Sequence, residues 1–256
     1  MDAQRIKNAV RSAYASIARA DDTSSCCSGS CCGAESDSRN HGYSREELSS
    51  VPEGADLGLG CGNPQAIARL LPGQTVLDLG SGGGLDCFLA AQQVGSTGLV
   101  IGVDMTPEMV ARARKNARET GATNVEFRLG EIEHLPVADG SVDVVISNCV
   151  VNLAADKRAV FREAHRVLRP GGRLAITDVI VSSTLPEEIR NDMALHAGCL
   201  AGAATIEEHE QLLVEAGFVE VRVRPDETSR MFIRDLVEGS DVDVHVISAT
   251  IEATRP

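Results

Sequence analysis

Apolar residues recur along the chain at two different spacings, and these spacings divide it into alternating strands and helices. Apolar runs typical of buried strands are TVLDL (75–79), LVIGVD (99–104), NVEFRL (124–129), SVDVVISN (141–148) and GRLAITDVIV (172–181). Helical spacing predicts helices near 84–93, at 107–120 and at 156–168. This alternation predicts an α/β fold with a mostly parallel sheet.

The ends of the chain add further elements. An amphipathic helix is expected at the N-terminus, since apolar side chains recur at helical spacing at Ile6, Val10, Ala13, Tyr14 and Ile17. Beyond the last strand of the central region, helices are expected at 186–200 and 205–216. The final apolar run, VDVHVISATIEA (242–253), suits a strand lying antiparallel at the sheet edge.

Two stretches read as linkers. Residues 21–40 are rich in Ser, Gly and Asp, which is typical of a mobile loop, and residues 49–62 are rich in glycine. We therefore expect three parts: an N-terminal extension over 1–62, a central α/β domain over 63–182, and a small C-terminal lobe over 183–256 that ends in a sheet strand.

Composition and charge exclude several classes of protein. A chain of 256 residues with 43% hydrophobic content can bury one sizeable core. Its net charge of −13, without a basic stripe, argues against nucleic acid as a partner. No apolar run is long enough to span a membrane, and the N-terminus lacks the apolar segment of a secretory signal. We expect a cytoplasmic monomer.

The loop after the first strand, Asp78-Leu79-Gly80-Ser81-Gly82-Gly83-Gly84, indicates the kind of cofactor. A dinucleotide fingerprint requires a third glycine where this chain has Leu85 or Cys87, and the phosphate-binding P-loop motif is absent. Asp78 and Asp86 make the loop unfavourable for a pyrophosphate and favourable for an ammonium or sulfonium. Asp104, at the end of the second strand, is placed to accept hydrogen bonds from ribose hydroxyls.

This combination, with LGEIEHLP after the third strand, resembles the class I S-adenosylmethionine (SAM)-dependent methyltransferases across residues 75–180. The resemblance implies a Rossmann-like sheet of seven strands. It also implies that SAM binds along the loop from Asp78, with the backbone of Gly80, Ser81 and Gly82 facing its methionine part. The remaining implied contacts are ribose at Asp104, adenine between Met105 and Ile132, the adenine amino group near Glu131, and either SAM or Cys149 at Asn148.

The chain has eight cysteines, and buried hydrophobic packing is the ordinary role of each. Cys149 directly follows the fourth strand, at the sheet edge where open α/β folds bind ligands. Cys61 lies in the glycine-rich segment GLGCGNP, and Cys199 lies between small residues in HAGCLAGA. Cys87, on the helix after the glycine loop, is expected to be a core residue.

The cysteine-bearing segments sharpen the resemblance. LGLGCGNP, VLDLGSGGGLDCF, GVDMTPEM, SNCVVNL, LPEEIRNDMALHAGCLAGA and VISATIEA are similar to the arsenite methyltransferase family in its short bacterial form, from about Tyr43 to the C-terminus. The resemblance implies that Cys61, Cys149 and Cys199 bind As(III). It implies a fourth, N-terminal cysteine, for which Cys32 is our choice and Cys31 the next. The cluster CCSGSCC departs from the family pattern, and a zinc site or a nonessential tail remains open for it.

Arsenic chemistry agrees with this assignment. As(III) is thiophilic, and three thiolates give a pyramidal site whose lone pair attacks the methyl group of SAM without a general base. The resemblance implies mono- and dimethylated products, arsenic detoxification, and a thiol reductant such as thioredoxin or glutathione. The alternatives are a methyltransferase of an organic small molecule, which 3% aromatic residues and no tryptophan disfavour, and a non-catalytic metalloid-binding protein.

Overall fold

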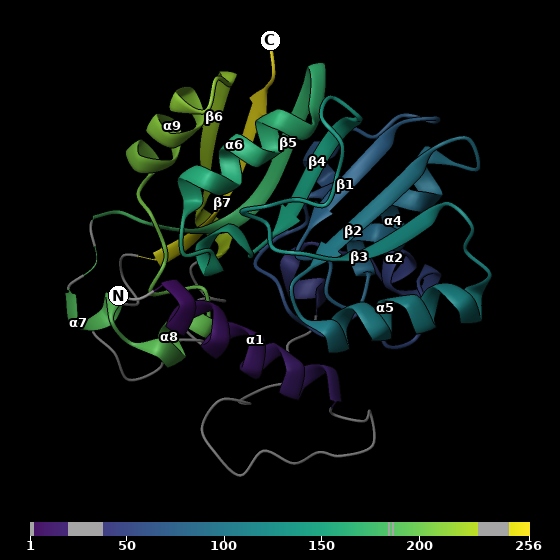
Figure 1. The fold of residues 1–256 in the computed structure, drawn as a ribbon, viewed down its shortest axis with the longest axis horizontal. Coiled ribbons are helices and arrows are strands. Elements are labelled where there is room, and N and C mark those ends of the chain that lie inside the picture. Colours follow the sequence, from purple (N-terminus) through teal and green to yellow (C-terminus); the bar gives the residue numbers. More distant parts are fainter. Residues whose placement is uncertain (1–2, 20–37, 184, 186, 230–245) are drawn as a thin grey trace.

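A computed structural model describes residues 3–19, 38–183, 185, 187–229 and 246–256. Its strands form one seven-stranded sheet in the order β3-β2-β1-β4-β5-β7-β6 (Figure 1). The strands are β1 (Thr75–Leu79), β2 (Leu99–Asp104), β3 (Val125–Leu129), β4 (Val142–Asn148), β5 (Leu168–Val181), β6 (Val219–Asp226) and β7 (Val246–Thr254). The first five are parallel, and β7 is antiparallel to both of its neighbours, β5 and β6. This confirms the Rossmann-like α/β fold.

Helices cover both faces of the sheet, because its central strands β1, β2 and β4 are apolar on both faces. The α-helices are α1 (Ala3–Arg19), α2 (Arg45–Ser50), α3 (Gln65–Ala68), α4 (Leu85–Val94), α5 (Pro107–Thr120), α6 (Lys157–Val167), α7 (Glu187–Arg190), α8 (Met193–Ala197) and α9 (Ile206–Glu215). One core lies between the sheet, α4 and α5, and includes Phe88 and Val110. The other lies between the sheet, α6 and α9, and includes Phe161 and Leu213.

Two expectations for the C-terminal part were wrong in detail. The last strand does not form the edge: β7 pairs with β5 over its full length, and the edge strand is β6. Strand β6 was not predicted, although Val219, Val221 and Val223 alternate with charged residues. The expected helix at 186–200 is interrupted, since Asp192 caps a separate α8 by accepting hydrogen bonds from the backbone amides of Ala194 and Leu195.

The N-terminal helix α1 packs across the carboxyl ends of the strands, against α5, α8 and the short 3₁₀ turn η2 (Val151–Leu153) (Figure 1). Its apolar face buries Ile6 and Val10 beside Leu153 and Cys199. Lys7 on the same helix forms ion pairs with Glu131 at 2.6 Å and Glu133 at 3.2 Å. The helix thus covers the sheet edge at which α/β folds bind their ligands.

Among the described residues, no helix combines the length and apolar character that crossing a membrane requires.

Candidate active site

The glycine loop between β1 and α4 has the backbone geometry that its sequence requires. Gly80 and Gly82 adopt φ angles of 73° and 51°, which L side chains rarely adopt. A Cβ atom added to Gly82 would meet no atom within 4 Å, so the loop faces open space there. The hydroxyl of Ser81 is buried and has no hydrogen-bond partner among the described residues. A buried hydroxyl beside an open glycine is suited to a bound polar ligand.

Asp104 closes one side of this loop. Its carboxylate accepts hydrogen bonds from the backbone amides of Gly82 at 3.0 Å and Thr106 at 2.8 Å. Burial raises the pKa of this carboxyl group. Because a carboxylate accepts about four hydrogen bonds, capacity remains for ribose hydroxyls.

Asp78 lies beneath the loop, in the core. Its carboxylate is buried and accepts a hydrogen bond from the Cys87 thiol at 3.2 Å. Burial and the nearby Asp86 raise the pKa of Asp78 well above its usual value. Cys87 is a core residue as expected, and it is also the hydrogen-bond partner of Asp78.

The residues assigned to adenine by the resemblance lie on the other side of Asp104. Ile132 is buried in the core, and Met105 is half-buried beside the α1 cluster. The Glu131 carboxylate is bound by α1, with Lys7 at 2.6 Å and Arg11 at 3.4 Å. The hydrogen bond from Lys7 lowers the pKa of Glu131. Helix α1 therefore contacts the region in which adenine is expected.

Three of the cysteines singled out in the sequence converge above this loop. The Sγ atoms of Cys61 and Cys149 lie within 4.8 Å of one another and of a carboxylate oxygen of Asp178. The Cys199 thiol donates a hydrogen bond to the Cys149 carbonyl oxygen at 2.8 Å. The Cys149 thiol lies near the thiols of both Cys61 and Cys199. Side chains far apart in the sequence thus form one sulfur cluster, consisting of Cys61, Cys149 and Cys199.

Backbone contacts hold each sulfur in the cluster. The side chain of Asn148 accepts from the Cys61 amide at 3.0 Å and donates to the Gly62 carbonyl at 2.7 Å. Asn148 thereby positions the Cys61 segment, whereas the two roles expected for it, binding SAM or orienting Cys149, stay predictions. The Cys149 amide donates to the Thr177 carbonyl at 2.8 Å, which fixes the turn after β4.

Two thiols of the cluster, those of Cys149 and Cys61, have raised pKa values. Hydrogen bonds from Cys199 and Cys61, together with burial, raise the pKa of Cys149 well above its usual value. Burial also raises the pKa of Cys61. These thiols therefore remain protonated at neutral pH until a ligand replaces their protons.

The sequence analysis did not single out Asp178, a fully buried residue on β5. Its carboxylate accepts from the Asn152 amide at 3.2 Å, the Asn152 side chain at 2.8 Å and the Val179 amide at 2.8 Å. Burial raises its pKa to about 6, and Lys157 acts in the opposite direction. The signal available in the sequence was an aspartate inside an otherwise apolar strand, LAITDVIV.

Tyr14 was predicted as a residue of an amphipathic helix, with no role in a site. Its hydroxyl lies near Cys199, Cys149 and Asp104. Burial and these neighbours raise the pKa of Tyr14 well above its usual value, so the hydroxyl stays protonated. Tyr14 thereby links α1 to the sulfur cluster and to Asp104.

The sulfur cluster lies directly against the glycine loop. A Cβ atom on Gly80 would come within 2.5 Å of a methyl carbon of Val150, the residue after Cys149. Because the turn that carries Cys149 touches Gly80, a ligand in the loop and one bound by the cysteines would be neighbours.

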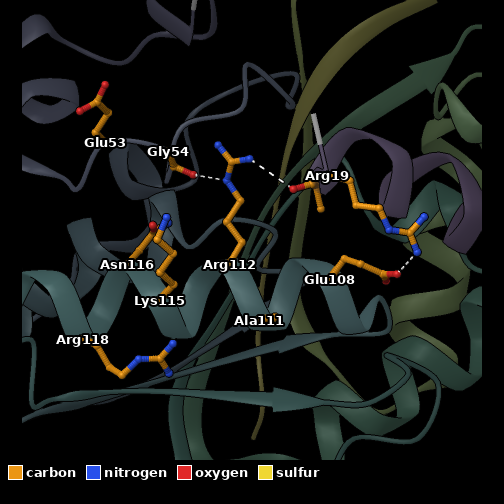
Figure 2. A pocket seen from close by; sticks show the side chains of 10 residues that line it. Arg19, Glu53, Gly54, Glu108, Ala111, Arg112, Lys115, Asn116 and Arg118 are labelled. Carbon is orange, nitrogen blue, oxygen red and sulfur yellow. Dashed lines mark hydrogen bonds and ion pairs between the residues drawn. The ribbon is translucent and has the colours of Figure 1, made fainter. Parts of the chain in front are cut away.

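A separate cavity lies on the outer side of this region. Figure 2 shows it between the end of α1, helix α5 and the Glu53–Gly54 segment. Its volume is about 470 Å³. Arg112 donates to the carbonyl oxygens of Gly54 at 2.8 Å and Ala18 at 3.4 Å, and Arg19 pairs with Glu108. The cavity is lined by charges of both signs and contains none of the site residues. Cys32, the fourth cysteine expected, lies outside the described residues.

Comparisons with known proteins agree with this geometry. The model of a family described as "Methyltransferase domain" matches residues 70–217. The arsenite methyltransferase of Halobacterium salinarum is 51% identical over 100% of this chain and 68% of its own length. Those of Aquipseudomonas alcaligenes and Homo sapiens are each 43% identical, over 80% and 70% of this chain. The chain spans only 59% and 50% of the lengths of these two relatives.

A solved structure shows the same fold. The arsenic(III) S-adenosylmethionine methyltransferase of Chlamydomonas reinhardtii is 36% identical, with a TM-score of 0.64 over 82% of this chain and 70% of that one. Phosphoethanolamine N-methyltransferase 2 of Haemonchus contortus, solved with S-adenosylmethionine, is 20% identical with a TM-score of 0.62 over 76% of this chain and 51% of that one, and supports the fold alone. The chain therefore belongs to the arsenite methyltransferase family, within the class I SAM-dependent methyltransferases.

Proposed function

We propose that this chain transfers methyl groups from SAM to trivalent arsenic held by Cys61, Cys149 and Cys199. The observation that carries the proposal is the convergence of these side chains against the glycine loop. Membership of the arsenite methyltransferase family supports it independently. The expected products are mono- and dimethylated arsenic.

The loop residues fit SAM. Gly82 borders open space, the buried Ser81 hydroxyl lacks a partner among the described residues, and Asp104 retains acceptor capacity for ribose. When bound, SAM supplies an electrophilic methyl group. The role of the chain is to hold that group beside the sulfur cluster, and good alignment of two reactants is worth about 7 kcal/mol or more of the activation barrier.

Arsenic binding requires no catalytic base, because the protons that the thiols lose leave with the hydroxyl groups of arsenious acid as water. Each of three thiols gives its proton to one hydroxyl of arsenious acid, three S–As bonds form and three waters leave. The product is neutral, which suits a buried cluster whose thiols are protonated beforehand. Arsenic bound to three sulfur atoms keeps a lone pair, the nucleophile that methyl transfer requires.

Methylation leaves arsenic in the pentavalent state, so each cycle requires two electrons. Two cysteine sulfurs supply them by joining in a disulfide, which returns methylated arsenic to the trivalent state. A dithiol reductant such as thioredoxin, or glutathione, then regenerates the two thiols. This requirement favours a cytoplasmic setting, where such reductants keep thiols reduced, and a role in arsenic detoxification.

The decisive experiment combines the full chain with arsenite, SAM and a thiol reductant and separates the arsenic species by chromatography. Methylated arsenic is expected. The single changes Cys61→Ser, Cys149→Ser and Cys199→Ser should each lower its formation about a hundredfold or more, because the two sulfurs that remain do not hold arsenic in line with the methyl group. Cys87→Ser is the matched control, since it removes a thiol outside the cluster and retains a donor to Asp78.

Other results would exclude the proposal. An enzyme for an organic acceptor keeps most of its activity in at least one of the three cluster variants. A non-catalytic metalloid-binding protein binds arsenite regardless of SAM and is unaffected by Asp104→Ala.

A further inference from the structure

The buried carboxylate of Asp178 is a feature of the sulfur cluster that arsenic does not require. As(III) is satisfied by three sulfur ligands, yet a carboxylate oxygen lies within 4.8 Å of the Sγ atoms of both Cys61 and Cys149. Two thiols and a carboxylate are the donor set of a different ligand, a thiophilic divalent cation such as zinc.

The separations suit such an ion after a small closure. Zinc binds sulfur at about 2.3 Å and carboxylate oxygen at about 2.0–2.2 Å, so its ligand atoms lie roughly 3.5–3.8 Å apart. The separations here are at most 4.8 Å, so zinc binding would require the three ligand atoms to approach one another by at most about one ångström. The Cys199 thiol, which donates a hydrogen bond to the Cys149 carbonyl oxygen at 2.8 Å, is a further sulfur beside these residues.

Charge balance also favours a divalent cation. Lys157 is near enough to Asp178 to lower the pKa of its carboxyl group, and the set of an ionised Asp178, a cationic Lys157 and two protonated thiols carries no net charge. Zinc binding would break two S–H bonds, form two S–Zn bonds and release two protons to water. Two thiolates, one carboxylate, one ammonium and Zn²⁺ again sum to zero, and a buried site without net charge avoids a large desolvation cost.

We propose that Cys61, Cys149 and Asp178 form a zinc-binding site that competes with arsenite for the same two sulfurs. Zinc is then an inhibitor of the arsenic reaction, and Asp178 is the ligand that distinguishes the cation from the metalloid. Zinc binding does not depend on methylation, so this proposal and the proposed function can fail separately.

The test uses the full chain with the four N-terminal cysteines changed to serine, so that these four residues contribute no zinc binding. They are Cys26, Cys27, Cys31 and Cys32. Zinc affinity is measured by competition with a chromophoric chelator, with a phosphine reductant in place of thiols. We expect one zinc ion per chain and its release on titration with arsenite. Binding that arsenite does not displace would overturn the proposal.

Asp178→Asn tests the carboxylate. We expect the ratio of zinc affinity to arsenite affinity to fall about tenfold or more, since loss of even a partner of a metal ligand has an effect of that size. Asp156→Asn is the control, because it changes a nearby carboxylate that caps α6 into another good capping residue. An unchanged affinity ratio in Asp178→Asn would exclude Asp178 as a ligand.

A measurement on the serine-substituted chain itself covers the case in which Asp178→Asn does not fold. X-ray absorption at the zinc edge should show two or three sulfur neighbours and at least one oxygen neighbour. A shell of sulfur alone would contradict the assignment of Asp178. The arsenic assay on the chain with all eight cysteines reports independently on the proposed function.

Discussion

Cys149 and Cys199 adopt φ angles of 58° and 65°, in the left-handed region that non-glycine residues rarely occupy. Such angles cost of order 1 kcal/mol each and persist only where surrounding contacts impose them. Here two backbone hydrogen bonds impose them. The Cys149 amide donates to the Thr177 carbonyl, and the Cys199 amide donates to the His196 carbonyl. The strain therefore falls on two of the three cluster cysteines.

A substitution at Gly80 should disturb the loop and the sulfur cluster together. Gly80→Ala places a Cβ atom within 2.5 Å of Val150 at a φ of 73°. We expect a loss of about 1–3 kcal/mol in unfolding free energy. We also expect SAM affinity to be at least about tenfold weaker, because the loop must move away from Val150 by a few tenths of an ångström to about 1 Å. Thermal unfolding and calorimetric titration measure these.

The matched control for that change is Gly140→Ala. Gly140 has a similar φ of 55°, but a Cβ atom there meets nothing within 4 Å. It should share the loss of stability and retain SAM binding. Equal SAM affinities in the two variants would show that the contact with Val150 is unimportant.

His209 gives the fold a pH dependence. The ring is fully buried, and burial lowers its pKa to about 4, below the value of about 6.5 expected when unfolded. Between these values the unfolded chain binds a proton that the folded chain does not, so this contribution to stability is lost as the pH falls from about 6.5 to 4. The loss should be on the order of 1–3 kcal/mol.

The check is the unfolding free energy in denaturant at several pH values. His209→Asn keeps a donor toward the Thr205 carbonyl but does not titrate, so the slope in this pH window should flatten. The exposed His134, changed to Asn, should leave the slope as it is. A slope unaltered by His209→Asn would refute the assignment.

At the scale of elements, α1 joins the two halves of the site. Its charged residues Lys7 and Arg11 contact Glu131, while its apolar residue Val10 and its Tyr14 reach Cys199. The helix adds little to the main cores, which lie on either side of the sheet. Its contribution is therefore expected to be larger for activity than for global stability.

Val10→Asp tests that expectation. A carboxylate at a position 2% exposed and without a cationic partner should detach α1 from the sheet edge. Arsenite methylation should fall about tenfold or more, while the melting temperature of the rest of the molecule changes by only a few degrees. Asn8→Asp places the same charge on the exposed face of the same helix and should preserve activity. Similar rates for the two variants would show that docking of α1 is unnecessary.

At the scale of the whole molecule, the sulfur cluster ties together distant parts of the chain. Cys61 precedes β1, Cys149 follows β4 and Cys199 follows α8. The Ser248 hydroxyl on β7 also donates to the Cys61 carbonyl, so the C-terminal strand supports the same point. A ligand shared by the cluster should therefore stabilise the folded molecule as a unit.

Arsenite should accordingly raise the melting temperature. A free concentration of 100 times the dissociation constant adds about 2.7 kcal/mol, which for a chain of this size corresponds to roughly 5–10 °C. The shift should persist in Cys87→Ser and largely disappear in Cys149→Ser. An equal shift in Cys149→Ser would place the bound arsenic elsewhere.

The sequence by itself determined the elements from β1 to β5 with α4, α5 and α6, since periodicity and glycine punctuation act within a few residues. It also predicted that the glycine loop, Asp104 and Cys149 share one sheet edge, because parallel strands end on the same side. The roles of Cys61, Cys199 and the adenine residues came from resemblance, and arsenic binding by the cluster stays a prediction.

Only the tertiary structure decided which distant segments meet. The insertion of β7 between β5 and β6 and the approach of Tyr14 to Cys199 leave no local pattern. An aspartate in an apolar strand is visible in the sequence, but its position beside two thiols is not. Each depends on strand pairing and packing summed over the molecule, which the spacing of residues along one segment does not encode.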